Sequence, residues 1–148
     1  MKTCGQVMTR DPRSCLGNES AQQAAQTMKR EDVGSIPVVQ DQQSKHLIGI
    51  VTDRDLAVNV VAEARDPRST RVQDVMTSHP VTCHETDDLN KAMDAMAQHQ
   101  VRRIPIVDNN NRLVGIVSQA DVATQSNAPK KTAEVIEKIS QSEKPAMH

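Results

Sequence analysis

The sequence of 148 residues contains no Phe, Tyr or Trp, and only 36 % of its residues are hydrophobic. Any core must therefore be built from Val, Ile, Leu, Met and Ala, which makes a thin core for a chain of this length. The absence of aromatic rings also excludes one common way of holding a nucleobase, which is stacking on an aromatic side chain. A base would have to lie between aliphatic side chains and backbone.

An excess of charge of one sign is lacking as well, since 18 basic residues stand against 19 acidic ones. This balance argues against electrostatic binding to nucleic acid or to an anionic membrane surface. No run of about 18 apolar residues is present, so we expect no membrane span. The first residues lack the apolar stretch of a signal peptide. The three cysteines show no Cys-x-x-Cys spacing, which argues against a disulfide framework or a zinc knuckle. We therefore expect a reduced, cytoplasmic setting.

What the sequence does contain is an internal repeat. The segment Val7–Thr9 recurs 68 positions later as Val75–Thr77, and Gly49–Asp55 matches Gly115–Asp121 at a shift of 66. The shift of 68 also pairs Pro12 with Pro80, Cys15 with Cys83, Met28 with Met96 and Pro37 with Pro105. So many matches in register predict two copies of one unit, with two extra residues in a polar loop of the first copy.

Each copy predicts the same order of elements. A short extended stretch comes first, because Pro12 and Pro80 favour an extended residue before them. An amphipathic helix follows, with Ser20 and Asp88 as its expected N-caps. The apolar stripes of the two helices are Ala21, Ala24, Ala25 and Met28, and Leu89, Ala92, Met93 and Met96. Strands are expected at 36–39, 47–51, 104–107 and 113–117, and a second helix begins near Asp53 or Gln119.

The predicted fold class is therefore α/β (α+β), with two β-α-β-β-α repeats packed into one body because a single copy leaves too much apolar surface exposed. The expected segments are repeat 1 at 1–61, a connector at 62–74, repeat 2 at 75–125 and a C-terminal helix and tail at 126–148. That helix is expected over 131–140 as a strap or a dimer contact. Its apolar side would carry Ala133, Ile136 and Ser140, with Val135 and Ile139 adjacent.

Both copies contain an Ile-Pro-(Val/Ile)-Val strand and end in Gly-Ile-Val-(Thr/Ser)-x-x-Asp. In these features residues 7–123 resemble a tandem pair of CBS domains, the Bateman module. The resemblance implies two clefts related by pseudo-twofold symmetry, which hold adenosine-containing ligands such as AMP, ADP, ATP, NAD or S-adenosylmethionine. It also implies a disc-like homodimer that regulates attached or partner proteins rather than catalysing a reaction.

The residue types of the motif suit a nucleotide. Gly115 lacks a Cβ, so backbone or ligand can approach the strand closely. Ser118 presents a hydroxyl beside helix N-terminal amides, which favours a phosphate. Asp121 lies one helical turn further on, where its carboxylate can accept hydrogen bonds from both ribose hydroxyls. The first copy has the same residue types at Gly49, Thr52 and Asp55. The alternative is that Thr/Ser caps the helix and Asp adds first-turn charge.

The resemblance further implies that each cleft combines the Ser/Thr and Asp of one copy with base-facing strands of the other. The cleft of Ser118 and Asp121 would then gain Arg102 or Arg103 for a phosphate. Its base wall would be Val33, Gly34 and Ser35, with Asp11 and Pro12 nearby. We therefore expect it to be the tighter site, although the two arginines could instead pair with surface carboxylates.

The opposite cleft would contain Thr52 and Asp55 and would face Val101, Arg102 and Arg103. It lacks an equivalent arginine in its own copy, and Arg54 is its candidate cation.

The expected function is an adenine-nucleotide sensor that acts on a separate, unidentified protein, since no effector domain is recognised. A ligand-free dimerisation scaffold and an S-adenosylmethionine sensor are the alternatives. An enzyme is not expected, because no catalytic constellation is found. His79, Cys83 and His84 lie close in sequence, but Cys83 is the repeat mate of Cys15, which has no neighbouring histidine. We therefore expect Cys83 to be a core residue rather than a metal ligand.

Overall fold

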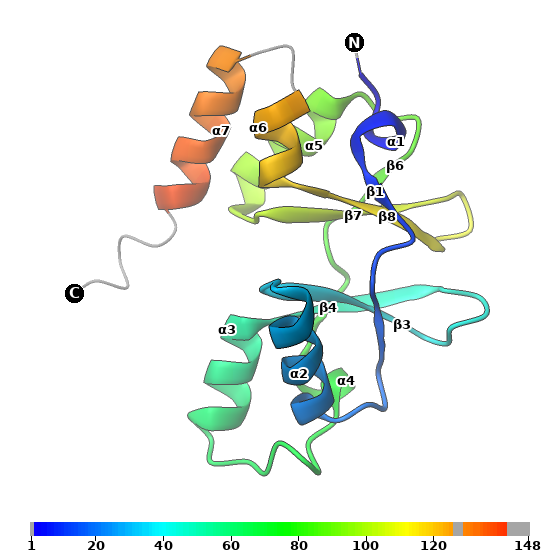
Figure 1. Cartoon of the computed structure of the whole chain (residues 1–148), viewed down its shortest axis with the longest axis vertical. Coiled ribbons are helices and arrows are strands. Elements are labelled where there is room, and N and C mark those ends of the chain that lie inside the picture. The colour runs from blue at the N-terminus through cyan, green and yellow to red at the C-terminus, as the bar shows by residue number, and fades with distance from the viewer. Residues whose placement is uncertain (1, 126–128, 142–148) are drawn as a thin grey trace. The chain divides into compact units, whose positions relative to one another are not determined.

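The computed structural model describes residues 2–125 and 129–141, which fold into two compact units. Unit 1 comprises the described parts of Met1–Pro12, Val81–Asn110 and Val114–His148. Unit 2 comprises Arg13–Pro80 and Asn111–Leu113. Each unit contains one four-stranded sheet, and in each the helices lie on one face of that sheet (Figure 1). The residues 126–128 and 142–148 of the expected C-terminal joint and tail lie outside the described residues.

The sheet of unit 1 has the strand order β1-β8-β7-β6. Its strands are β1 (Thr9–Arg10), β6 (Cys83–His84), β7 (Arg103–Val107) and β8 (Leu113–Ser118). Its helices are α1 (Cys4–Val7), α5 (Leu89–His99), α6 (Gln119–Gln125) and α7 (Pro129–Gln141).

The sheet of unit 2 has the matching order β2-β3-β4-β5. Its strands are β2 (Cys15–Leu16), β3 (Ser35–Val39), β4 (Leu47–Thr52) and β5 (Thr77–Ser78). Its helices are α2 (Ala21–Glu31), α3 (Asp53–Leu56), the π-helix η1 (Ala57–Val61) and α4 (Val72–Val75). The expected order of strand, helix, strand, strand and helix is thus confirmed in both copies, and each long strand is one residue longer than expected.

The threonine that ends each Val-Met-Thr segment, with the residue after it, joins the sheet that holds the long strands of the other copy. In unit 1, β1 runs antiparallel to β8, with Thr9 opposite Ile116. In unit 2, β5 runs antiparallel to β4, with Thr77 opposite Ile50. The boundaries of the compact units therefore differ from those of the sequence repeats.

The prolines do not have the predicted effect on the residues before them. Asp11 and His79, which precede Pro12 and Pro80, adopt left-handed backbone with φ of 49° and 54°. The expectation of an extended residue is therefore wrong at both places. Asp is among the residues that tolerate this conformation best, and Pro constrains its predecessor against right-handed helix more than against a left-handed turn.

The helix starts agree with the predicted caps. Ser20 and Gln23 form a capping box, and the Asp88 carboxylate accepts a hydrogen bond from the Asn90 amide. The apolar stripe of α5 is wholly buried. In α2 one predicted core residue, Ala25, is exposed instead.

The close approach at Gly115 and Gly49 involves the protein's own chain. A Cβ on Gly49 would lie 2.6 Å from Met76 Sδ and 2.8 Å from the Thr77 carbonyl oxygen. A Cβ on Gly115 would overlap Met8 Sδ and lie 3.0 Å from the Thr9 carbonyl oxygen. These glycines therefore make room for the neighbouring strand and its methionine, which is the backbone alternative of the two that the sequence left open.

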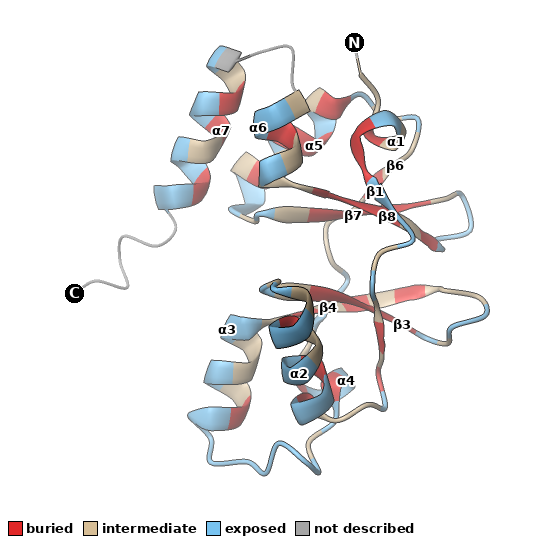
Figure 2. Cartoon of the chain, in the orientation of Figure 1, coloured by how far each residue is buried: buried red, intermediate tan, exposed pale blue. Residues whose placement is uncertain are grey.

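The C-terminal helix α7 is present, and it packs on α5 and α6 of unit 1. Its buried residues are Thr132, Val135 and Ile139. The predicted face of Ala133, Ile136 and Ser140 is therefore wrong, since Ala133 and Ser140 are exposed and Ile136 is half-buried. The red stripe along α7 in Figure 2 faces α5 and α6. The helix thus covers α5 and α6 within unit 1, and its expected role as a dimer contact stays a prediction.

Candidate functional site

The motif residues of the second copy lie where β8 passes into α6. Ser118 and Asp121 cap this helix reciprocally. The Asp121 amide donates to Ser118 Oγ at 3.2 Å, and the Ser118 amide donates to Asp121 Oδ2 at 2.9 Å. The capping role that the sequence offered as an alternative is therefore realised. It occupies one carboxylate oxygen, and no described residue donates a hydrogen bond to Oδ1 of Asp121.

The backbone of this corner is less open than expected. The Gln119 amide donates to the Arg102 carbonyl oxygen at 2.8 Å, which ties α6 to the residue before β7. The amide of Asp121 is taken by the Ser118 side chain. The expectation of free amides at this helix start is thus partly wrong, because two of the amides donate hydrogen bonds to acceptors of the protein itself. Side chains must supply most of the polar contacts to any ligand.

A pocket of about 320 Å³ lies at this corner. Arg102, Arg103 and Ser118 line it together with helix residues, so the structure brings together three of the predicted site residues. The remaining lining residues are Gln119, Ala120, Ala123 and Ile136. Among the described residues, the guanidinium of Arg103 makes no hydrogen bond or ion pair. The predicted alternative of surface pairing is therefore not seen for Arg103, and its charge is available to an anion.

The corresponding corner of unit 2 has the same capping box and a different charge. The Asp55 amide donates to Thr52 Oγ1, and the Thr52 amide to Asp55 Oδ2, both at 3.0 Å. Oδ2 of Asp55 also accepts from the Thr77 hydroxyl at 3.4 Å. Where α6 begins with Gln119, α3 begins with Asp53, whose carboxylate accepts from the Arg54 amide at 2.8 Å. An acidic residue, Asp53, therefore stands at the position that the neutral Gln119 has in unit 1.

The other predicted site residues are distributed over both units. Val101 packs against the core of unit 1. Asp11 and Pro12 belong to the same unit. In unit 2, the Asp53 amide donates to the Gly34 carbonyl oxygen at 2.9 Å, and Val33 packs against the core while Ser35 begins β3. Arg54 is exposed. The grouping of Val33, Gly34 and Ser35 with Ser118 and Asp121 stays a prediction.

Sequence reasoning missed four lining residues of the unit 1 pocket, which are Gln119, Ala120, Ala123 and Ile136. The difference between Gln119 and Asp53 was visible inside the aligned motif, and its charge could have flagged the two corners as unequal. Ile136 carries no such signal, because its place depends on how α7 docks.

Neither a metal centre nor a membrane helix is found in the part of the chain that the structure describes. No group of three or more His, Cys, Asp or Glu side chains there could hold a metal ion. No described helix combines the length and the apolar character needed to cross a bilayer. Cys83 is buried in the core of unit 1, as predicted.

The family model of the CBS domain matches this sequence twice, at residues 4–62 and 72–127. The CBS domain-containing protein YhcV of Bacillus subtilis is 39 % identical over 140 residues, which cover 95 % of this chain and 96 % of that protein.

Two solved structures share the fold. Hypoxic Response Protein I, described with two coordinated zinc ions, has a TM-score of 0.76 at 29 % identity and covers 84 % of this chain and 98 % of its own. The CBS domain pair of MJ0100, in complex with 5′-methylthioadenosine and S-adenosyl-L-methionine, has a TM-score of 0.75 at 25 % identity. That match covers 88 % of this chain and 99 % of that one.

Proposed function

The chain belongs to the CBS domain family, of which it carries two copies, and we propose that it is a regulatory module that binds an adenosine-containing nucleotide at the Ser118 corner of unit 1. The observation that carries this proposal is the pocket itself. Arg102, Arg103 and Ser118 line it. Asp121 is not among the lining residues but caps α6 together with Ser118 through one oxygen, and its other oxygen remains as an acceptor.

Each group has a distinct role in this proposal. Arg103 and Arg102 contact phosphate, for which the guanidinium offers several donors in a planar array. Oδ1 of Asp121 accepts hydrogen bonds from the ribose hydroxyls while Oδ2 keeps the helix cap. Because the cap already fixes the carboxylate, little side-chain entropy is lost on binding. The base-facing residues remain those that the resemblance implies, which are Val33, Gly34, Ser35, Asp11 and Pro12.

The charge of the pocket discriminates among adenosine ligands. Two arginines attract the phosphates of AMP, ADP, ATP or NAD and repel the sulfonium of S-adenosylmethionine. We therefore rank the phosphorylated ligands above S-adenosylmethionine, although the CBS pair of MJ0100 is described with that ligand.

The two corners differ in their expected affinity. At the Thr52 corner, the Asp53 carboxylate repels a phosphate and occupies the Arg54 amide. The Asp55 carboxylate there also receives the Thr77 hydroxyl. The Ser118 corner is therefore the tighter site in this proposal, and the Thr52 corner binds more weakly or prefers a ligand without phosphate.

The pocket also offers a route by which occupancy could reach a partner protein. Ile136 on α7 lines the pocket, while Val135 and Ile139 of the same helix hold it to the core of unit 1. A ligand that contacts Ile136 favours one position of α7 over others, and so alters what the helix presents to a partner or to a second copy in a homodimer. The regulated protein is a separate chain in this proposal.

A thermal-shift series tests the proposed function. AMP, ATP, NAD and S-adenosylmethionine are each added to the protein after it has been stripped of ligand by unfolding and refolding. A binding nucleotide stabilises the folded state by about 2.7 kcal/mol at a hundredfold excess over Kd. The Arg103→Ser variant, which copies Ser35, should lose most of this shift for AMP and ATP. No shift with any of the four would favour the ligand-free dimerisation scaffold instead.

A further inference from the structure

Two of the three cysteines meet in the core of unit 1. Cys4 on α1 and Cys83 on β6 are both buried in the same core cluster, α1 packs on β6, and each thiol shifts the pKa of the other. Cys4 Sγ also lies 3.8 Å from the carbonyl oxygen of Asp88. Seventy-eight residues of chain separate the two cysteines, yet they belong to one compact unit.

The position of Cys4 is fixed by its backbone. The Cys4 amide donates to the Asp87 carbonyl oxygen at 2.8 Å, and the Gly5 amide donates to the Glu85 carbonyl oxygen at 2.9 Å. These two bonds dock α1 on the segment that follows Cys83. The contact between the thiols therefore follows from how the backbone is docked as well as from side-chain rotamers.

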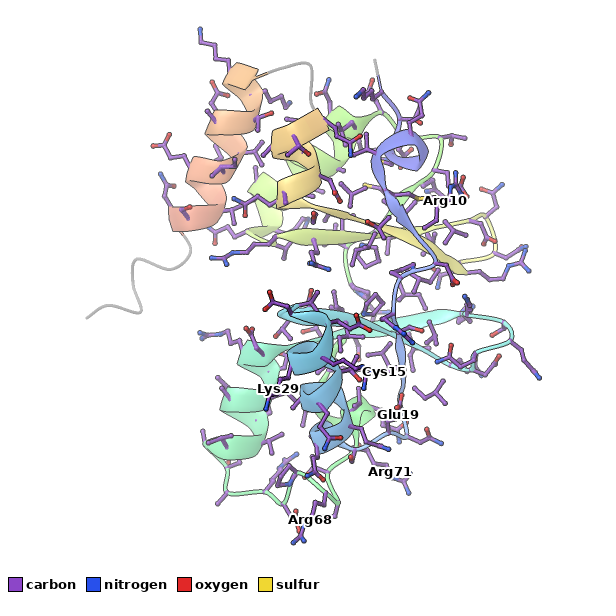
Figure 3. All side chains as sticks on the ribbon, viewed as in Figure 1. Arg10, Cys15, Glu19, Lys29, Arg68 and Arg71 are labelled. Carbon is purple, nitrogen blue, oxygen red and sulfur yellow. The ribbon has the colours of Figure 1, made fainter. Side chains whose placement is uncertain are left out.

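The other copy contains the same docking without the second thiol. Val72 is the repeat mate of Cys4, and its amide donates to the Glu19 carbonyl oxygen at 2.8 Å. The Gln73 amide donates to the Gly17 carbonyl oxygen at 2.9 Å, as Gly5 does to Glu85. Cys15, labelled in Figure 3, is the mate of Cys83 and shares its core cluster with Val72. The pair of thiols is thus a feature of unit 1 alone.

The two thiols of the pair are chemically unequal. The interaction with the Cys4 thiol lowers the pKa of Cys83, and Lys91 acts in the same direction, while burial and Asp87 act against them without reversing the shift. The pKa of Cys4 is raised, first by this interaction between the thiols and then by burial. For comparison, burial raises the pKa of Cys15 to about 12. Cys83 is therefore the nucleophile of the pair, because the thiolate is the reactive form.

We propose that Cys4 and Cys83 form a reversible disulfide that locks α1 to β6, with a peroxide as the oxidant. The Cys83 thiolate attacks one peroxide oxygen, the O–O bond breaks, and Cys83 becomes a sulfenic acid, while the departing hydroxide takes up the proton that the Cys83 thiol released and leaves as the first water. The Cys4 sulfur then attacks the Cys83 sulfur. The S–S bond forms, the S–O bond breaks, and the departing hydroxide takes the Cys4 proton as the second water. Both thiols are oxidised, and hydrogen peroxide is reduced to water.

Access to the buried thiols requires a local opening of α1. This helix has only four residues, so few backbone hydrogen bonds of its own must break for it to open locally. Once formed, the disulfide prevents that opening and restricts the unfolded chain. Oxidation should therefore hold β1, which directly follows α1, in the sheet of unit 1.

The test uses the full chain, reduced and then treated with hydrogen peroxide, and measures intact mass, free thiols after denaturation, and the urea midpoint. The expected result is the loss of two hydrogen atoms, a decrease from three free thiols to one, and a Cys4–Cys83 peptide in the digest. The urea midpoint should rise, and dithiothreitol should reverse all of these changes.

The repeat provides matched variants. Cys4→Val copies Val72 and should abolish the disulfide while leaving the reduced protein folded. Cys15→Ala should leave the disulfide unchanged. Val72→Cys should create a second pair, with Cys15, that also oxidises. Three free thiols after peroxide treatment of the wild-type protein would overturn the proposal. So would a disulfide that includes Cys15, a bond only between chains, or oxidation that stops at sulfinic acid.

Discussion

The two units are built from the same repeat, but only one of them is covered by an additional helix. In unit 1, Val135 and Ile139 of α7 complete the core formed with α5 and α6. In unit 2 no such helix is found among the described residues, and Val58 and Val61 of η1 are 47 % and 77 % exposed. Figure 2 shows the buried stripe of α7 against unit 1. The duplication thus builds two scaffolds, and an addition to the sequence differentiates them.

The two units also differ in the residues around their capping boxes. Unit 1 has Arg102, Arg103 and Gln119 around its capping box, and the corresponding residues of unit 2 are Gly34, Ser35 and Asp53. Both boxes are formed by the same hydrogen bonds, so the box is a property of the fold. Any difference between the ligands of the two corners must then come from the residues around the box, which are cationic at Arg102 and Arg103 and anionic at Asp53.

Removing the contact of α7 should have the largest effect on stability. Ile139 is 1 % exposed, so Ile139→Ala should reduce the free energy of unfolding by about 2–5 kcal/mol. Val61→Ala, on the uncovered side of unit 2, should change it by less than about 0.5 kcal/mol. Urea denaturation of both variants measures the difference. Equal losses would show that η1 is as well covered in solution as α7.

Substituting alanine for each of the two glycines should destabilise the protein by unequal amounts, a difference that the sequence does not show. Gly49→Ala places its Cβ 2.8 Å from the Thr77 carbonyl oxygen, which cannot move without breaking strand pairing. At Gly115→Ala the closest atom is likewise a methionine sulfur, that of Met8, but the Thr9 carbonyl oxygen lies slightly farther away, at 3.0 Å. Overpacking of this kind costs about 1–3 kcal/mol, and we expect Gly49→Ala at the upper end.

Urea midpoints with matched slopes would measure both glycine variants. A larger loss of stability in Gly115→Ala would show that the contact of the added Cβ with the methionine, rather than with the neighbouring strand, determines the cost.

A smaller effect is expected from pH at the turn before α5. The His84 amide donates to Asp87 Oδ2 at 2.8 Å, and this bond holds the pKa of Asp87 below its ordinary value. The resulting stabilisation is complete above the unfolded pKa of about 3.9 and is lost as pH falls through the lower, folded pKa. Asp87→Asn should therefore be less stable than wild type at pH 7, by under about 1 kcal/mol, and the gap should close in acid. A gap that is constant from pH 7 to pH 2 would contradict this.

Much of the fold could be predicted from the sequence because the two copies of the repeat can be compared with each other position by position. The strands at 36–39 and 104–107 are short apolar runs with no competing pattern, and Ser20 and Asp88 are strong caps. Asp11 and His79 could not be predicted, since their left-handed backbone is imposed by a strand that joins the other copy's sheet. The face of α7 also depends on tertiary docking, which selected Val135 and Ile139 over Ile136.

The residue types of the candidate site could be predicted from the sequence. The contacts that these residues make were harder to predict. Ser118 and Asp121 follow from the motif, but the capping box consumes groups that the sequence left free. Arg102 and Arg103 stood out only because the repeat mates are Gly34 and Ser35. Ile136 is separated from all of these in sequence and could be found only in the folded chain.

Calorimetric titration of the Asp121→Ala and Asp55→Ala variants distinguishes the Ser118 corner from the Thr52 corner as the nucleotide site. Both variants lose the same capping-box acceptor, so their stabilities should fall by similar amounts. With the nucleotide that gives the largest thermal shift, Asp121→Ala should weaken binding by about 1.5–3 kcal/mol, and Asp55→Ala should leave the tighter site intact. Unchanged affinity in Asp121→Ala, or an equal loss in both variants, would contradict a nucleotide site at the Ser118 corner.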